Sequence, residues 1–491
     1  MKSPVGDTTQ LNSGSLRPLC VDMDGTLLAT DALWESIVLV AKKQPTLLLW
    51  LPFWLYRGKA FLKWQLALHV TLNPALLPHN EAVVSFVTAA RRAGRYVVLA
   101  TAADRRVADT VAQRLDVFSA VLASDGERNL SGREKLAAIV DHLKGADFDY
   151  IGNSSTDLPI WKAAARSVLV RPSGSLLAKA RRISSVHEIS WTRRTPVATL
   201  FRALRIHQWS KNALLFVPLL LAHRLTDSER VLQGVIAFVA FGLAASAVYL
   251  ANDLLDLETD RQHPQKRFRP IASGELSIPM ALGLIPVAIG ASVVVSAATL
   301  PFSFVALLLL YLLTTSAYSL GLKRIAIVDV LVLAGLYTLR VVAGAAATDI
   351  AVSPWFLAFS MFIFLSLALV KRYAELKIAS DADPTGYHPH LSGRPYLIGD
   401  LDLLRSVGST SGYLSVAVLA LYLNSPEVHR QYDSPMLLWL IGPLLLYWLT
   451  RVWLLAHRGQ LNIDPVLFAL TDRTSYAVAT LVVAILTFAS L

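Results

Sequence analysis

Three closely spaced aspartates form the clearest chemical pattern in the sequence. Asp253, Asp256 and Asp260 lie three and four residues apart, so a single helix would place all three carboxylates on one face. Carboxylates held this close repel one another unless a cation lies between them. At the end of a membrane span such a cluster indicates a functional site, and a pair of Mg²⁺ ions bridging a diphosphate would neutralise it. The alternative is a solvated, charged loop without a ligand.

Basic residues in several polar segments are candidates to bind phosphate oxygens. Each of them could equally contact lipid headgroups or mark the cytoplasmic side of a membrane. Asn252 precedes the acidic cluster and is expected to support the start of its helix. Arg340 lies inside an apolar run, where it needs either a paired acid, for which Asp329 is a candidate, or a direct role in substrate binding. The phosphate candidates are Lys211, Lys266, Arg267, Arg269, Lys323, Arg324, Lys371 and Arg372.

A second group of chemically active residue types lies in the first third of the chain. Asp22 and Asp24 follow a short apolar run, and alternate residues at the end of a strand point the same way. One carboxylate could then attack a phosphorus atom while the other handles the proton. Further polar residues that accompany later apolar runs are Thr101, Lys135, Asn153 and Asp157.

The segments that would position these residues alternate between strand and helix patterns. This alternation predicts a parallel α/β sheet. In such a sheet the ligand site lies beyond the carboxyl ends of the strands, which is where the polar residues fall. The predicted strands cover residues 19–21, 96–100, 121–123, 150–151 and 168–170.

The order of these motifs, DxDGT followed by threonine, lysine and an acid, resembles the haloacid-dehalogenase (HAD) superfamily of phosphatases. The resemblance implies that Asp22 is the nucleophile and Asp24 the general acid/base. It implies that Thr101 and Lys135 hold the phosphoryl group. It also implies that Asp157 joins Asp22 and the backbone carbonyl of Asp24 in holding Mg²⁺.

One position departs from the HAD pattern. The last motif of the superfamily usually begins with aspartate, and this sequence has Asn153 there. An amide ligates Mg²⁺ less strongly than a carboxylate, so the departure weakens the expected activity. A retained fold that no longer hydrolyses phosphate is therefore the alternative.

Composition divides the chain into a soluble head and a membrane body. Of 491 residues, 54% are hydrophobic and only 16% are charged, and the mean hydropathy is +0.49. Residues up to about 194 have a globular pattern, whereas almost everything after residue 214 consists of long apolar runs. This pattern predicts nine membrane spans. They begin near Asn212, Val231, Pro279, Pro301, Ile325, Pro354, Thr410, Pro435 and Ser475.

Basic residues predict the orientation of these spans. Residues 266–269, 323–324, 371–372 and 457–458 fall in the loops after the second, fourth, sixth and eighth predicted spans. Since Lys and Arg accumulate in cytoplasmic loops, we expect a multi-pass protein of a bacterial-type inner membrane, with the head and active sites in the cytoplasm. The net charge of +11 has the same explanation, because no nucleic-acid recognition motif accompanies it. The single cysteine, Cys20, excludes an intramolecular disulfide.

Residues 46–70 form an insertion between the first two motifs of the head, where HAD proteins often carry a cap. Pro52, Arg57, Lys59 and Lys63 interrupt this segment too often for a membrane span. Its tryptophans and basic residues instead predict an amphipathic helix on the membrane surface. Such a helix would keep the head near a lipid-bound substrate.

The pattern NDxxDxxxD at residues 252–260 resembles the UbiA family of membrane transferases, and the resemblance covers roughly residues 200–491. It implies nine spans, with Asp253, Asp256 and Asp260 holding Mg²⁺ on a diphosphate leaving group. Most members use prenyl diphosphate as donor and carry a second Asp-rich motif after the sixth span. Here that place reads KRYAELK, with Glu375 as its acid. Its basic residues suggest a second substrate that bears phosphate.

Several segments resemble one branch of this family, the decaprenyl-phosphate phosphoribosyltransferases. In that branch 5-phosphoribosyl diphosphate is the donor and a polyprenyl phosphate is the acceptor. Diphosphate leaves C1 of the ribose through an oxocarbenium-like state. The product keeps a 5-phosphate, which the phosphatase head could remove. The segments are RIHQWSKN at 205–212, HPQKRFRPIASG at 263–274, YSLGLKRIAIVDVLVLAGLYTLRVVAG at 318–344 and KRYAEL at 371–376.

Two rival interpretations stay open. One is a UbiA-type prenyltransferase that moves a prenyl group from prenyl diphosphate to an aromatic or lipid acceptor. The other is a non-enzymatic scaffold or transporter with relict acidic clusters. Neither rival involves nucleic acid, and the sequence leaves a homo-oligomer open.

The predicted architecture combines two fold classes. An α/β, HAD-like (Rossmannoid) domain covers residues 17–194, after a disordered segment at 1–16. An all-α, polytopic membrane domain with the UbiA fold covers residues 195–491. Mg²⁺ is the expected cofactor, and the bilayer, the donor diphosphate and the polyprenyl phosphate are the expected partners.

Overall fold

The computed structural model describes residues 17–189, 196–382, 394–461 and 464–490. The predicted disordered segment 1–16 lies outside these residues. The chain divides into two compact units. Unit 1 comprises Met1–Ala203 and Leu250–Leu284, and unit 2 comprises Leu204–Tyr249 and Ile285–Leu491. The acidic segment around Asp253 therefore folds with the N-terminal head, although the boundary predicted after residue 194 assigns it to the membrane domain.

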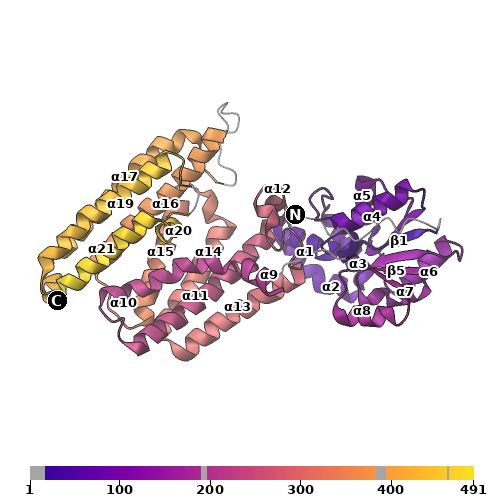
Figure 1. The fold of residues 1–491 in the computed structure, drawn as a ribbon, viewed down its shortest axis with the longest axis horizontal. Helices are drawn as coiled ribbons and strands as arrows, with labels where there is room; N and C mark the ends of the chain where they lie inside the picture. The colour runs from indigo at the N-terminus through magenta and orange to yellow at the C-terminus, as the bar shows by residue number, and fades with distance from the viewer. Residues whose placement is uncertain (1–16, 190–195, 383–393, 462–463, 491) are drawn as a thin grey trace. The chain divides into compact units, whose positions relative to one another are not determined.

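Unit 1 contains a six-stranded sheet (Figure 1). The strand order is β3-β2-β1-β4-β5-β6, and every neighbouring pair runs parallel. The prediction of a parallel α/β sheet is confirmed. The partly buried β6 was not predicted, because its four residues, Val-His-Glu-Ile, form neither an apolar run nor an apolar-polar alternation. The strands are β1 (Leu19–Val21), β2 (Val97–Asp104), β3 (Ala120–Ser124), β4 (Asp149–Gly152), β5 (Arg166–Val170) and β6 (Val186–Ile189).

Successive side chains of the central strand pack on opposite faces of the sheet. Leu19 and Val21 belong to one apolar core, and Cys20 between them belongs to another. Because β1 pairs with both β2 and β4, residues near the carboxyl ends of these three strands come together. The helices on the first face are α4 (Glu81–Arg92) and α5 (Arg105–Leu115), and those on the second are α6 (Arg133–His142), α7 (Leu158–Ala163) and α8 (Gly174–Arg181).

The insertion of the head is helical. After α1 (Ala32–Lys43), a 3₁₀-helix over Pro45–Trp50 leads into α2 (Leu51–Tyr56) and then α3 (Lys59–His69). The side chains of Trp50 and Tyr56 are 54% and 90% exposed, although both are aromatic. An exposed aromatic surface of this kind is what a helix lying on a membrane requires, and that membrane contact stays a prediction.

The acidic segment joins two long helices. α11 (Ser228–Leu255) ends within it, α12 (Leu257–Gln262) forms its middle, and α13 (Ile278–Thr299) follows. The prediction of one helix through all three aspartates is wrong, because Asp256 lies at a break with φ −95° and ψ 11°.

Seven helices in the described part of the chain are long and apolar enough to cross a membrane. They are α11 and α13, which both units share, and five helices of unit 2. Two of the nine predicted spans are shorter. The first corresponds to a 3₁₀-helix over Ile206–Phe216 with α10 (Val217–Leu221), and the ninth to α21 (Arg473–Ala489). The five helices are α14 (Phe302–Leu320), α15 (Val328–Ala347), α16 (Pro354–Ala382), α17 (Leu401–Leu423) and α19 (Ile441–His457), and the last two reach membrane-spanning length together with the 3₁₀ segments Ile398–Asp400 and Pro435–Leu440 that precede them.

The long helices of unit 2 pack in chain order, with α14 on α15, α15 on α16, α16 on α17, and α17 on α19. Figure 1 shows α16, α17, α19 and α21 side by side. Gly344 of α15 lets another segment come unusually close, since a Cβ there would lie 2.0 Å from the carbonyl oxygen of Leu215. This approach fixes the 3₁₀-helix that carries Lys211 and Asn212 against α15.

Candidate functional site

Two of the three predicted metal-binding aspartates converge on one point. An Nη1 atom of Arg269 lies 3.1 Å from Oδ1 of Asp253 and 2.5 Å from Oδ2 of Asp260. Both carboxylates are buried, with 3% of each residue exposed. Asp256 stands between them as the N-cap of α12. Two buried carboxylates around one cationic atom provide the hard oxygen donors that Mg²⁺ prefers, so this pair fits the metal that the acidic pattern implies.

A group of three or more candidate metal ligands is absent from the residues that the structure describes. Asp253 and Asp260 would therefore be the core of the site, completed by substrate oxygens or water. Of the neighbouring basic residues, Arg269 contacts the acids, whereas Lys266 and Arg267 are exposed. Asn252 is half-buried in the last turn of α11.

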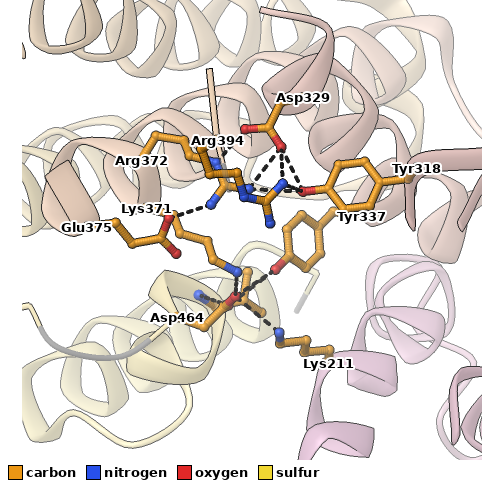
Figure 2. A network of polar contacts seen from close by, with 10 residues as sticks. Lys211, Tyr318, Asp329, Tyr337, Lys371, Arg372, Glu375, Arg394 and Asp464 are labelled. Carbon is orange, nitrogen blue, oxygen red and sulfur yellow. Dashed lines mark hydrogen bonds and ion pairs between the residues drawn. The ribbon is translucent and has the colours of Figure 1, made fainter. Parts of the chain in front are cut away.

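A second polar cluster lies within unit 2, around Asp464 (Figure 2). Oδ2 of Asp464 accepts hydrogen bonds from Nζ of Lys211 at 3.1 Å and from Nζ of Lys371 at 2.9 Å. The hydroxyl of Tyr337 donates to the same carboxylate, 3.2 Å from Oδ1. The fold thus brings together two predicted phosphate ligands that are 160 positions apart in the sequence. Asp464 caps the N-terminus of α20 (Pro465–Ala469) by accepting from the backbone N–H of Val466.

The Asp464 cluster contains more cationic side chains than carboxylates. Burial lowers the pKa of Lys211 to about 8, although Asp464 opposes that shift. Burial would raise the pKa of Asp464, but the ammonium groups of Lys371 and Lys211 outweigh it and hold that pKa well below its usual range. The pKa of Asp464 is therefore lowered by its two ammonium partners, and the pKa of Lys211 is lowered by burial.

Arg340 adds a further cation next to this cluster. Its Nε donates to Oδ1 of Asn212 at 3.1 Å, and its Nη2 donates to the hydroxyl of Tyr311 at 3.1 Å. Its guanidinium also lies over the rings of Tyr311 and Tyr337, at 4.9 and 5.8 Å. The predicted pairing of Arg340 with Asp329 is wrong. Neutral groups and aromatic faces hold this buried guanidinium instead.

Asp329 is the centre of a different network, which Figure 2 also shows. Its carboxylate is paired with Arg372 of α16 and with Arg394, whose Nη1 lies 3.1 Å from Oδ1. The hydroxyl of Tyr318 donates to the same oxygen at 2.7 Å. The prediction that residues 371–372 form a polar loop is wrong, because both lie inside α16. Arg372 is only 1% exposed, and Asp329 neutralises it.

Two other predicted phosphate ligands lie in a turn beside the Asp329 network. Lys323 and Arg324 form the 3₁₀ turn Leu322–Arg324, in which Arg324 is exposed. The carbonyl oxygen of Lys323 accepts from Arg394 at 3.3 Å. Asp464 and Arg394 were missed by sequence reasoning. An Asp-Pro pair that starts a helix was the available signal for Asp464.

The residues predicted for the head site do come together at the carboxyl edge of the sheet. Nζ of Lys135 lies 2.8 Å from Oδ1 of Asp22 and 3.6 Å from Oδ1 of Asp157. The hydroxyl of Tyr150 donates to Asp157 at 2.9 Å. Thr101 is fully buried in β2, and its Oγ1 accepts from the N–H of Ala103. Two carboxylates around one ammonium group form an oxygen-rich site that fits Mg²⁺.

The two aspartates of the DxDGT motif differ in protonation. Burial raises the pKa of Asp22 to about 6, and Lys135 opposes the shift. Burial, with help from Asp31, raises the pKa of Asp24 to about 8. Oδ1 of Asp24 accepts from the N–H of Ala32 at the start of α1, 2.9 Å away. A lower pKa at Asp22 than at Asp24 is the order that a nucleophile and a general acid require.

Asn153 lies directly on the DxDGT loop. A Cβ at Gly25, whose φ is +71°, would be 2.1 Å from Nδ2 of Asn153. The backbone N–H groups of Asn153 and Ser154 donate to Oδ2 of Asp157. The amide therefore occupies the place in the site where the motif leads us to expect it, and glycine at position 25 makes room for it.

Comparison with known proteins identifies the family. The chain is 39% identical over 474 residues to the uncharacterized protein y4nM of Sinorhizobium fredii, which covers 95% of this chain and 89% of that protein. It is 35% identical over 291 residues to the nodulation protein NoeC of Azorhizobium caulinodans, covering 58% of this chain and 91% of that protein. It is 42% identical over 187 residues to the decaprenyl-phosphate phosphoribosyltransferase of Mycobacterium tuberculosis, covering 37% of this chain and 62% of that protein.

Among solved structures, the chain is similar to a UbiA homologue from Archaeoglobus fulgidus bound to GPP and Mg²⁺. The match covers 59% of this chain and 99% of that chain. The TM-score is 0.45 and the identity 17%. The profile of the UbiA prenyltransferase family matches residues 213–471, which include the acidic segment and most of unit 2. With its apolar helices of membrane-spanning length, the chain is a multi-pass membrane protein that belongs to the UbiA prenyltransferase family.

Proposed function

We propose that the membrane body transfers phosphoribose from 5-phosphoribosyl diphosphate to a polyprenyl phosphate. The observation that supports this choice is the cluster of the buried Arg340 with the partly buried Lys211 and Lys371. Asp464 is the one carboxylate among the described residues that contacts Lys211 and Lys371, and Arg340 donates to the neutral amide of Asn212. Excess positive charge in a partly buried cluster suits a second substrate that bears phosphate, which carries more negative charge than the single carboxylate of an aromatic acid. Similarity to the mycobacterial phosphoribosyltransferase supports the same donor.

The reaction exchanges one bond at C1 of the ribose for another. The C1–O bond to diphosphate breaks, and diphosphate takes the electron pair. An oxygen of the lipid phosphate forms the new C1–O bond, and it needs no protein base because it is already anionic. Asp253 and Asp260, with Asp256, would hold Mg²⁺, which neutralises the charge of the departing diphosphate. Lys211 and Lys371 would orient a phosphate group of either substrate.

We further propose that the head removes the 5-phosphate from the lipid-linked product. A charged Asp22 attacks phosphorus, and a protonated Asp24 gives its proton to the leaving 5-oxygen. Lys135 and Thr101 hold the phosphoryl oxygens. Water then hydrolyses the phosphoryl–Asp22 bond and releases inorganic phosphate. The product of the whole chain would be a polyprenylphosphoryl-ribose.

The direct test supplies both candidate donors to the same membranes. Membranes containing the full chain are incubated with Mg²⁺, polyprenyl phosphate and labelled 5-phosphoribosyl diphosphate, and label is counted in the organic phase. A parallel reaction contains labelled prenyl diphosphate and 4-hydroxybenzoate. We expect label in the lipid of the first reaction. Product in the second reaction alone would replace the proposal with prenyl transfer.

Asp22→Asn should separate the two activities. We expect the 5-phosphorylated lipid to accumulate and the dephosphorylated lipid to fall more than about a hundredfold, because the amide cannot attack phosphorus. The sum of the two lipids should stay at the wild-type level. Chromatography of the labelled lipids measures the ratio. Asp141→Asn, the same change at an exposed position of α6, is the control, and an unchanged ratio in Asp22→Asn would refute the phosphatase role.

Lys211 should make transfer sensitive to alkaline pH. Its folded pKa of about 8 is below its ordinary value, so the ammonium group that would attract phosphate is lost as pH rises through 8. We expect kcat/KM to fall up to about tenfold per pH unit above that point. Lys211→Arg should move the decline to higher pH, because guanidinium stays protonated. Lys179→Arg, at an exposed position of α8, should leave the profile unchanged; the same decline in Lys211→Arg would exclude Lys211 as its origin.

A further inference from the structure

The acidic segment of the transferase shares a buried ion pair with the head. Nη2 of Arg261 lies 2.6 Å from Oε1 of Glu35, and Nη1 of Arg261 lies 3.1 Å from Oε2. The two side chains are 6% and 5% exposed. Arg261 belongs to α12, and Glu35 belongs to α1 of the head. The two parallel hydrogen bonds fix both the distance and the orientation between these helices.

Each partner of the pair is held by a further contact. Nε of Arg261 donates to the carbonyl oxygen of Ala272 at 3.0 Å, which closes the acidic segment on itself. The hydroxyl of Thr30 donates to Oε1 of Glu35 at 2.6 Å. The pair is therefore part of a fixed network and not a mobile surface contact.

The backbone of the acidic segment also approaches the head closely. Gly274 of the acidic segment has a φ of +71°, and a Cβ there would lie 2.4 Å from the carbonyl oxygen of Ala29. Only glycine permits this approach of the segment to the loop after the DxDGT motif. Val38 and Leu39 of α1 also line a pocket together with Leu254 and Leu257 of the segment.

We propose that Glu35 and Arg261 are positioning residues for the transferase, so that the head supports transfer independently of its own hydrolytic chemistry. Arg261 directly follows Asp260, whose carboxylate shares Arg269 with Asp253. Fixing α12 on α1 therefore fixes where Asp260 stands relative to Asp253. Loss of the pair loosens that spacing while both carboxylates remain present. The inference rests on the acidic segment as the transferase centre, and it holds for either donor.

The test compares Glu35→Gln, Arg261→Gln, the double variant and Asp22→Asn in the full chain. In the two single variants we expect at least a tenfold fall in the kcat of transfer, and a rise in the Mg²⁺ concentration that gives half-maximal rate. KM for the lipid should change little. Asp22→Asn should transfer at the wild-type rate. Either single substitution already breaks the Glu35–Arg261 pair. The double variant should therefore lose no more transfer activity than either single variant.

A second readout does not depend on activity. In the metal-free chain, hydrogen–deuterium exchange of residues 257–262 should accelerate in both single variants, while the strands of the head keep wild-type protection. Arg261→Lys, which keeps the charge but loses the forked contact, should give intermediate exchange and transfer.

Three outcomes would overturn the inference. They are wild-type kcat and Mg²⁺ dependence in Glu35→Gln, additive losses in the double variant, and global loss of protection in the head. An equal loss in Asp22→Asn would show instead that transfer needs the head's chemistry. If the wild-type chain does not use 5-phosphoribosyl diphosphate, the proposed donor is wrong. The variants are then compared with one another in reactions that contain prenyl diphosphate as the donor.

Discussion

Replacing Asp253 with asparagine should reduce transfer more than about a hundredfold while the chain still folds. Asp253 and Asp260 share one nitrogen of Arg269, so Arg269 keeps Asp260 as its partner when the first charge is removed. The amide has the shape of the carboxylate, but it ligates a hard cation less strongly. Transfer of label from 5-phosphoribosyl diphosphate into the organic phase measures the effect, at matched amounts of each chain in the membrane.

Glu258→Gln is the matched control for this experiment. It removes one negative charge from α12, at a half-buried position two residues from Asp260. We expect transfer by this variant to stay within about threefold of the wild type. Comparable losses in both variants would mean that the total charge of the segment matters and not the Asp253–Asp260 pair.

Replacing Asp329 with asparagine should lower the free energy of unfolding by about 3–5 kcal/mol. The substitution leaves the guanidinium of Arg372, which is 1% exposed, without its buried partner. Glu375, whose side chain is 38% exposed, still contacts Arg372 but does not replace a fully buried carboxylate. Arg394 loses its partner as well. Denaturant titration in detergent, followed by tryptophan fluorescence, measures the change.

Asp381→Asn provides a control within α16. Asp381 forms an exposed pair with Lys377, and exposed pairs contribute less than about 1 kcal/mol. The double variant Asp329→Leu, Arg372→Met should recover part of the stability lost in Asp329→Asn, because it leaves neither charge of the Asp329–Arg372 pair buried alone. If Asp329→Asn unfolds at the same denaturant concentration as Asp381→Asn, the network around Asp329 is not what stabilises the centre of unit 2.

The sheet was predicted well from the sequence because each strand can be recognised from a short run of neighbouring residues. Short apolar runs ended by polar residues identified β1 to β5, and the parallel order then brought Asp22, Lys135 and Asp157 to one edge. The acidic cluster was predicted as a metal site, and two of its members, Asp253 and Asp260, converge on Arg269. Its geometry was not, because helical spacing alone does not reveal a break such as the one at Asp256.

Pairs that are distant in the sequence account for the errors in unit 2. Two adjacent charges at Lys371 and Arg372 resemble a loop, and the pattern gives no sign that Asp329, 43 residues earlier, neutralises Arg372 inside a helix. Asp464 stands 253 positions after Lys211 and 93 after Lys371, so local spacing cannot connect them. Charged residues inside membrane bundles are predictable as paired, but their partners depend on tertiary packing.

Unit 1 is assembled from two stretches of chain, Met1–Ala203 and Leu250–Leu284, with Leu204–Tyr249 between them. The ribosome delivers these stretches in order, so the sheet can form while the intervening residues are still being made. The second stretch emerges with the end of α11 and is followed at once by α13. A nascent chain can therefore complete unit 1 only if both helices enter the bilayer with residues 256–277 on the side of the head. Completion of unit 1 is therefore tied to the direction in which these two helices insert.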